Sequence, residues 1–237
     1  MAVWLILFVA CATSAALLVV WHKSRTAAQA DYIRTYMFPP GLLDKFDKLQ
    51  PQLGLKDRQI VARALRQFFL AHLKSGCKFV AMPSEVVDQL WHEFILYTRH
   101  YEQFCKKAFG RYMHHTPAVV LEPTARNDNE GLRRTWWYVC IEENINPRKP
   151  TRLPLLFALD AKFHIANGFH YQPNCSKLRQ HDNASGYCGS EFSDSSFDGS
   201  SAGFGDSSSS SHSDSSGSSS DSGSSGGCSG GCGGGGD

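Results

Sequence analysis

One aspartate and three histidines are the residues of this chain whose types and spacing point to chemistry. Asp88 and His92 stand four positions apart, so on a helix their side chains project from one face, one turn from each other. His114 and His115 follow soon after Gly110, where the chain can turn back toward that helix. Carboxylate and imidazole groups bind zinc and other divalent metals. Asp88, His92, His114 and His115 therefore form a candidate metal site.

The same residues also admit structural roles. Asp88 and His92 can form a helix-stabilising pair, and the two later histidines can donate ring N–H groups to backbone carbonyls of the following segment. The zinc-protease pattern H-E-x-x-H is absent, since Leu96 occupies the position of its second histidine. Metal binding, structural support and direct catalysis all remain open from these residues, and no catalytic residue or cofactor-binding residue is predicted.

Other catalytic and binding signatures are weak or missing. The phosphate-binding pattern G-x-x-x-x-G-K-[ST] does not occur, and the match to G-x-S-x-G at 199–203 lies in a Ser/Gly-rich tract without a preceding strand. Basic residues are scattered outside any nucleic-acid-binding module. No nucleic-acid partner is therefore expected.

Helical periodicity dominates the middle of the chain and must position the candidate site. Apolar residues recur at helical spacing in 42–50 and 55–75, and Gly76 can end the second of these helices. The strongest pattern predicts one helix from Ser84, as N-cap, to Phe109. On such a helix Cys105 lies about 20 Å from His92, too far to share a site. Further helical segments are expected at 26–38, around 132–140 and at 154–163, whereas 77–82 is compatible with a short strand. The predicted fold class is mostly α.

The N-terminus predicts a membrane anchor. Residues 1–21 contain no charged side chain, and a helix of this length is about 30 Å long, which matches the hydrocarbon thickness of a bilayer. Trp4 and Trp21 lie near its two ends, and Lys23 and Arg25 follow it, so the positive-inside bias places the C-terminal side in the cytoplasm. A cleaved signal peptide and a buried core helix are the alternatives.

Charge separates the C-terminus from the rest. From 182 to 237 there are seven Asp, one Glu and no Lys or Arg, which gives −8. The other 24 basic and 14 acidic residues, which give +10, lie in 1–181. Ser and Gly dominate 182–237, so a disordered acidic tail is predicted there, with Cys228 and Cys232 near its end. An electrostatic contact between this tail and the basic region would weaken with salt.

Two blocks of motifs resemble a known family. The first reads V-D-x-x-W-H, a tyrosine, F-C, a glycine and H-H-x-P, and the second runs from Arg134 to Tyr171. Together they resemble the glycine-rich-domain-containing-protein-like family, in a bacterial-type form, over roughly residues 30–180. That family has no established biochemical activity, so the resemblance implies membership without a mechanism. The motif positions of the first block are Val87, Asp88, Trp91, His92, Tyr101, Phe104, Cys105, Gly110, His114, His115 and Pro117.

The sequence thus predicts four regions: a transmembrane anchor at 1–21, a juxtamembrane linker at 22–29, a helical domain at 30–181 and the tail at 182–237. The expected function is a single-pass, membrane-anchored binding or scaffold module with a candidate metal site. The alternative is a metal-dependent, hydrolytic enzyme that uses the Asp/His cluster. Expected partners are membrane lipid, through residues 1–21 and the adjacent basic residues, and a protein partner of unknown kind. The cofactor is left unknown, and a divalent metal such as zinc is the candidate that the cluster offers.

Overall fold

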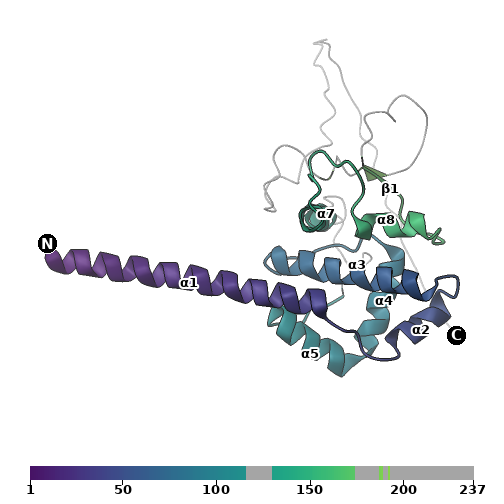
Figure 1. Cartoon of the computed structure of the whole chain (residues 1–237), viewed down its shortest axis with the longest axis horizontal. Coiled ribbons are helices and arrows are strands. Elements are labelled where there is room, and N and C mark those ends of the chain that lie inside the picture. Colours follow the sequence, from purple (N-terminus) through teal and green to yellow (C-terminus); the bar gives the residue numbers. More distant parts are fainter. Residues whose placement is uncertain (116–129, 174–186, 189–191, 193–237) are drawn as a thin grey trace, which may run out of the picture. The chain divides into compact units, whose positions relative to one another are not determined.

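The computed structural model describes residues 1–115, 130–173, 187–188 and 192. Among them are seven α-helices and one short parallel sheet, so the predicted mostly α fold is confirmed (Figure 1). The predicted tail lies outside the described residues, apart from 187–188 and 192. The elements are α1 (Ala2–Thr35), α2 (Leu42–Leu49), α3 (Leu55–Lys74), α4 (Glu85–Leu96), α5 (Thr98–Phe109), α7 (Glu130–Glu142), α8 (Leu155–Lys162), β1 (Tyr171–Gln172) and β2 (Tyr187–Cys188).

Helix α3 is the centre of the domain. It packs against α1, α4, α7 and α8, and almost every residue from Val61 to Leu73 is buried. Phe68 and Phe69 carry much of this packing, because their rings lie 5.0 and 6.1 Å from that of Trp91 on α4. Large aromatic side chains bury the most apolar area per residue, so this cluster fixes the position of α4 relative to α3.

The single helix predicted from Ser84 to Phe109 is wrong, because the chain breaks at Tyr97. That residue has non-helical angles, φ −80° and ψ 58°, and it separates α4 from α5. On one straight helix the residues 94 and 104 would lie about 15 Å apart along the axis. Here the rings of Phe94 and Phe104 are 5.5 Å apart, since α5 folds back onto the core. The break lets both helices bury their aromatic faces together.

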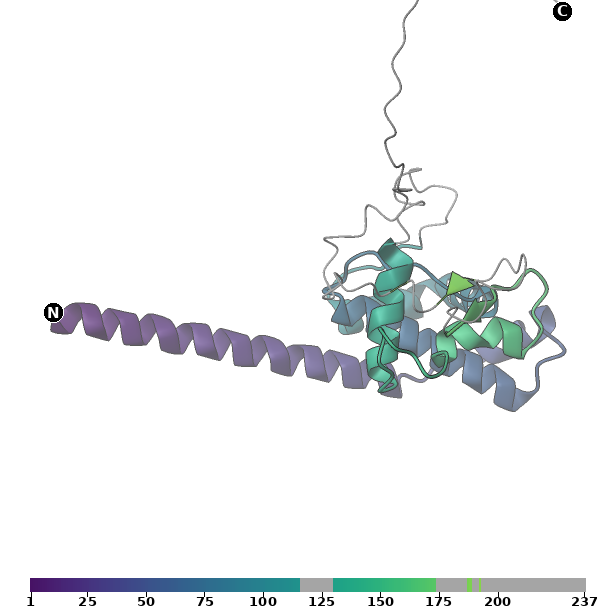
Figure 2. The ribbon, with the colours of Figure 1, turned by 90° about the horizontal axis from the view of Figure 1, so that it is seen from above.

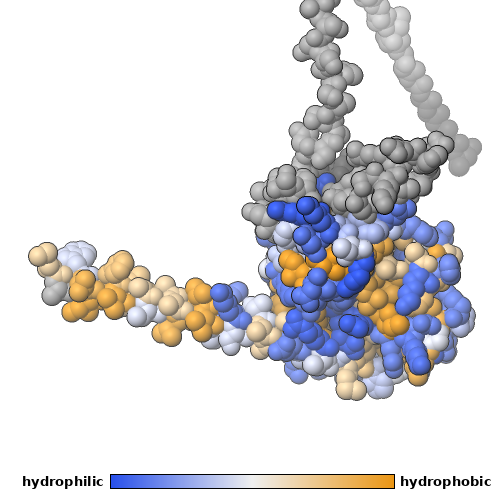
Figure 3. Space-filling model, turned by 45° about the horizontal axis from the view of Figure 1, so that its top comes forward, coloured by the Kyte–Doolittle hydropathy of each residue, from blue (hydrophilic) through white to orange (hydrophobic). Residues whose placement is uncertain are grey.

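Helix α1 runs without interruption from Ala2 to Thr35, and its first part projects from the packed helices in both ribbon views (Figures 1 and 2). Residues 22–29, treated as a linker from the sequence, are therefore helical. The segment 26–38 is mostly the end of α1, and Pro39 and Pro40 follow it. Hydrophobic residues cover the projecting part, with hydrophilic ones where it meets the domain (Figure 3).

Helix α1 is long and apolar enough to cross a membrane, over Val3–Thr35, and none of its most apolar window is buried. The alternative of a buried core helix is therefore wrong. Its last turns belong to the domain instead: Ala30 and Ile33 are buried, and α1 packs against α3 and α5. One helix thus provides both the apolar N-terminal stretch and part of the core.

A bidentate ion pair joins the end of α1 to α7. Arg34 Nε and Nη2 donate to the two carboxylate oxygens of Glu142 at 2.8 and 3.1 Å, and Lys74 of α3 pairs with the same carboxylate. Burial alone would raise the pKa of Glu142, but these two cations more than offset it and lower that pKa below its ordinary value. The two ion pairs of Glu142 therefore link α1, α3 and α7.

Candidate metal centre

Asp88 and His92 come from consecutive turns of α4, as the sequence predicts. Ser84 caps this helix by accepting a hydrogen bond from the backbone N–H of Val87 at 3.4 Å. The cap fixes where α4 begins, and Asp88 lies in the first turn. His92 Nδ1 lies 3.4 Å from Asp88 Oδ2, and the His92 side chain is 52% exposed.

His115 reaches α4 from the segment after α5, and a buried tyrosine holds that segment in place. The Tyr101 hydroxyl donates to the Met113 carbonyl at 2.7 Å and accepts from Trp91 Nε1 at 3.1 Å. Burial raises the pKa of Tyr101 well above its ordinary value, so the phenol stays a donor. The His115 ring then packs edge-on against the Trp91 ring, with centroids 4.7 Å apart.

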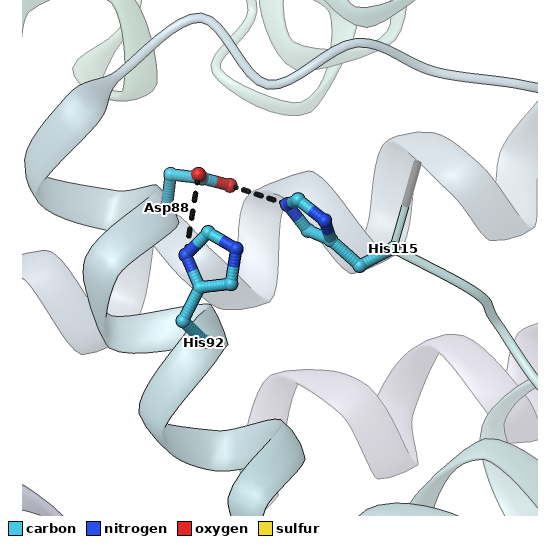
Figure 4. A group of neighbouring side chains, drawn as sticks. All are labelled: Asp88, His92 and His115. Carbon is cyan, nitrogen blue, oxygen red and sulfur yellow. Dashed lines mark hydrogen bonds and ion pairs between the residues drawn. The ribbon is translucent and has the colours of Figure 1, made fainter. Parts of the chain in front are cut away.

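The Asp88 carboxylate lies between the two imidazoles (Figure 4). Its Oδ1 lies 3.1 Å from His115 Nε2, and the ligand atoms of Asp88, His92 and His115 all lie within 4.8 Å of one another. One carboxylate oxygen and two imidazole nitrogens are a donor set that suits zinc, whose bonds to such ligands are about 2.0–2.2 Å long. Small side-chain rotations would bring all three atoms onto one ion.

His114 stands apart from this cluster. Its side chain is exposed, and its ring contacts Tyr112 with centroids 4.8 Å apart. Of the four residues predicted as ligands, the structure brings Asp88, His92 and His115 together and turns His114 elsewhere. Cys105 is buried beside Tyr101 and does not belong to the cluster, as predicted, although the reason is a separate helix rather than distance along one helix.

The cluster lines a cleft of about 650 Å³. The cleft walls are largely apolar and come from the segment 77–82, which forms no strand, from Tyr112 and Met113, and from Phe169. Glu85 also lines the cleft, one turn before Asp88 on α4. An apolar cleft with a few convergent polar groups is the usual form of a small-molecule site.

A buried aspartate that the sequence does not reveal as functional supports α4 from beneath. Asp160 of α8 is 1% exposed and accepts from Ser84 Oγ at 2.7 Å and from the backbone N–H groups of Glu85 and Val86 at 2.7 and 3.2 Å. It also accepts from the N–H of Phe169, a cleft residue, at 2.9 Å. A carboxylate at a helix N-terminus satisfies unpaired donors and interacts well with the helix dipole.

His72, another histidine of the cleft wall, is held neutral. Burial lowers the pKa of His72 to about 4, the hydrogen bond with the Lys78 carbonyl at 3.0 Å opposes that change, and the charge of Arg111 adds to it. Because a carbonyl only accepts, Nδ1 of the neutral ring is the donor, and Nε2 keeps its lone pair. Neither His72 nor Arg111 stands in a recognisable motif, so sequence reasoning had no signal for them.

These features define a class: a helical domain with an Asp/His cluster in a cleft, continuous with an apolar N-terminal helix. A family model described as UCP032817-like matches residues 28–192, more than half of the chain. The chain therefore belongs to the UCP032817-like family, an uncharacterised family. No curated protein and no solved structure matches it. Asp88, His92, His115 and Asp160 all lie inside the matched range.

Proposed function

We propose that this chain is a single-pass membrane protein whose helical domain binds one divalent metal ion, zinc first among them, through Asp88, His92 and His115. The observation that carries the proposal is the convergence of the three ligand atoms within 4.8 Å beside a cleft. A site of three protein ligands beside a cleft leaves the fourth position for water or a ligand, as in catalytic zinc sites. The centre would serve to bind and polarise a small molecule.

The metal content of the full-length protein tests this proposal. We expect one bound divalent ion per chain after purification in detergent without chelators, measured by inductively coupled plasma mass spectrometry. His115→Ala removes a ligand and should abolish the bound metal, whereas His114→Ala changes an adjacent exposed histidine outside the cluster and should retain it. Absence of stoichiometric metal, or equal metal in both variants, contradicts the proposal.

Hydrolysis is the second candidate function, and the apolar cleft beside the cluster favours it. A divalent ion held by Asp88, His92 and His115 would activate a water molecule at its open coordination position for hydrolysis of an ester or amide, which gives an acid and an alcohol or amine. Turnover of chromogenic esters that is lost in His115→Ala and kept in His114→Ala would support an enzyme. Bound metal without turnover would support the binding or scaffold module, in which the metal holds residues 113–115 against α4 and the surface serves a protein partner.

The proposed topology places the domain in the cytoplasm. Lys23 and Arg25 follow the apolar stretch directly, which supports this orientation by the positive-inside rule. The continuity of α1 with the buried residues Ala30 and Ile33 supports a retained anchor over a cleaved signal peptide. A C-terminal fusion to green fluorescent protein should fluoresce, and the matching fusion to alkaline phosphatase should be inactive. The reverse pattern would refute this orientation.

Kinship with the glycine-rich-domain-containing-protein-like family is part of the same proposal. Its support is the run of shared motif residues, which includes Asp88, His92 and His115. The resemblance and the matched family model span nearly the same residues, roughly 30–180 and 28–192. If the two families are related in this way, Asp88, His92 and His115 belong to a motif that both families share.

A further inference from the structure

The rim of the cleft lies next to the membrane end of the domain. The guanidinium of Arg25 stands over the ring of Trp21, the last residue of the uncharged stretch, at 5.5 Å from the centroid. Arg25 Nη2 also lies 3.5 Å from the point that a Cβ on Gly110 would occupy. The next residue, Arg111, lines the cleft. Two contacts thus connect the end of the apolar stretch to the cleft rim.

Exposed cations accompany the cleft-lining residues: Arg111 lines the cleft, and Lys78 stands in sequence between the lining residues Cys77 and Phe79. Arg25, Lys78, Lys107 and Arg111 are all exposed, and none of them forms an ion pair with a carboxylate in the part of the chain that the structure describes. Lys107 Nζ lies 5.8 Å above the Tyr32 ring of α1, and Arg111 Nη2 donates to the Gly76 carbonyl at 3.3 Å. Cations of this kind attract the anionic lipids of a nearby leaflet.

Two exposed aromatic residues complete the rim. Phe79 and Tyr112 are 41% and 42% exposed, and both line the cleft. Aromatic rings beside cations are the composition that proteins place at the headgroup level of a bilayer. Met82, Trp91 and Met113 also line the cleft, so part of its wall is apolar and can contact the lipid next to its headgroup.

The Asp/His cluster lies within one leaflet thickness of the residue that Arg25 contacts. His115 follows Gly110 by five residues, so the cluster lies within about 17 Å of the residue that Arg25 contacts. One leaflet of a bilayer, headgroups included, is about 20 Å thick. A phospholipid that slides outward beside α1 therefore reaches the cluster with its headgroup while part of its acyl chains stays in the membrane.

We propose that the cleft takes up the headgroup of an anionic membrane phospholipid, with Arg111 as its anion partner at the rim and the Asp88–His92–His115 centre beneath it. Binding of the headgroup at the Asp88–His92–His115 centre depends on the metal ion proposed above. Asp88 and Glu85 line the cleft with negative charge, and an anionic headgroup would be repelled unless a divalent ion balances them. The ligand of the metal centre is then lipid drawn from the bilayer and not a soluble metabolite.

Photocrosslinking of the full-length chain in nanodiscs tests the proposal. The probe is phosphatidylglycerol with a diazirine in its acyl chain, and a phosphatidylcholine probe of the same length is the zwitterionic control. We expect adducts on peptides that cover 77–92 and 111–115, in addition to those on 1–25. Arg111→Gln should reduce the cleft adducts about tenfold, the effect of losing one charge-assisted contact. Arg99→Gln, an exposed arginine at the opposite end of α5, should leave them unchanged.

Metal content measured on the same samples separates this proposal from the metal centre. Bound metal with adducts confined to 1–25 refutes the lipid cleft and leaves the metal centre standing. Cleft adducts on a preparation without metal refute the metal centre, and they also refute the need for a divalent ion to balance Asp88 and Glu85; only lipid entry into the cleft is then supported. Equal cleft labelling by the two probes, or no effect of Arg111→Gln, refutes recognition of the anionic headgroup.

Discussion

Neutral His72 makes the stability of the domain depend on pH. The pKa of His72 is about 4 in the folded chain, mainly because of burial, whereas an exposed histidine has an ordinary value of 6.5. Between these two values the unfolded chain binds one more proton than the folded one. Stability that is present above pH 6.5 is therefore lost as the pH falls toward 4, by about 3 kcal/mol from this residue alone.

Thermal unfolding of the full chain in detergent, followed by circular dichroism from pH 7 to pH 4, measures this effect. In His72→Gln the amide can still donate to the Lys78 carbonyl and does not titrate, so its melting temperature should fall less over this range. Carboxylates titrate alike in both proteins, so the difference between the two curves isolates His72. Parallel curves would contradict a buried neutral imidazole.

At the scale of elements, Asp160 joins α8 to the start of α4 through four accepted hydrogen bonds. Asp160→Ala leaves the Ser84 hydroxyl and three backbone N–H groups without that acceptor, so we expect a loss of about 3 kcal/mol in unfolding free energy. Ser84→Ala removes the cap but keeps the aspartate, and should cost about 1 kcal/mol. Chemical denaturation measures the unfolding free energy of both variants. If Asp160→Ala loses no more than Ser84→Ala, Asp160 does not stabilise the start of α4.

Local signals explain which elements the sequence predicts well. Periodic apolar residues, the Ser84 cap and the stop at Gly110 are all local, and they mark α2, α3, the start of α4 and the end of α5. The break at Tyr97 has no local mark, since neither Gly nor Pro stands there. It arises from tertiary packing, because Phe94 and Phe104 gain a shared core only if the helix is interrupted.

In the candidate site, too, local sequence signals predict some features and tertiary packing decides the others. Helical spacing alone places Asp88 and His92 together, and the turn after Gly110 predicts that a histidine returns to them. Spacing cannot decide between His114 and His115, because that choice depends on the hydrogen bond from Tyr101 to Met113. Asp160 lies more than 70 residues from the start of α4, to which it is hydrogen-bonded, and Arg111 belongs to no motif. Only the three-dimensional arrangement therefore identifies these two residues.

At the scale of the whole molecule, the unbroken α1 acts as a strut of fixed length. A helix rises 1.5 Å per residue, so in the proposed topology the number of residues between Trp21 and the buried Ala30 sets how high the cleft stands above the bilayer. The ion pair of Arg34 with Glu142 fixes the domain end of this strut. The length and the stiffness of α1 can be changed independently by insertions of different composition.

Two insertions of equal length between Ser24 and Arg25 distinguish these variables. Seven helix-forming residues would lift the domain by about 10 Å and return it to nearly the same facing, since seven residues make almost two turns. Seven Gly and Ser residues add the same number of residues but bend freely, so the domain can settle back onto the membrane. We expect cleft adducts to vanish with the helical insertion and to persist with the flexible one, while both proteins keep their metal. Equal loss in both would show that α1 is no strut. Under the proposed lipid uptake, the length of α1 is a spacer that sets how far a lipid must rise to meet the Asp/His cluster.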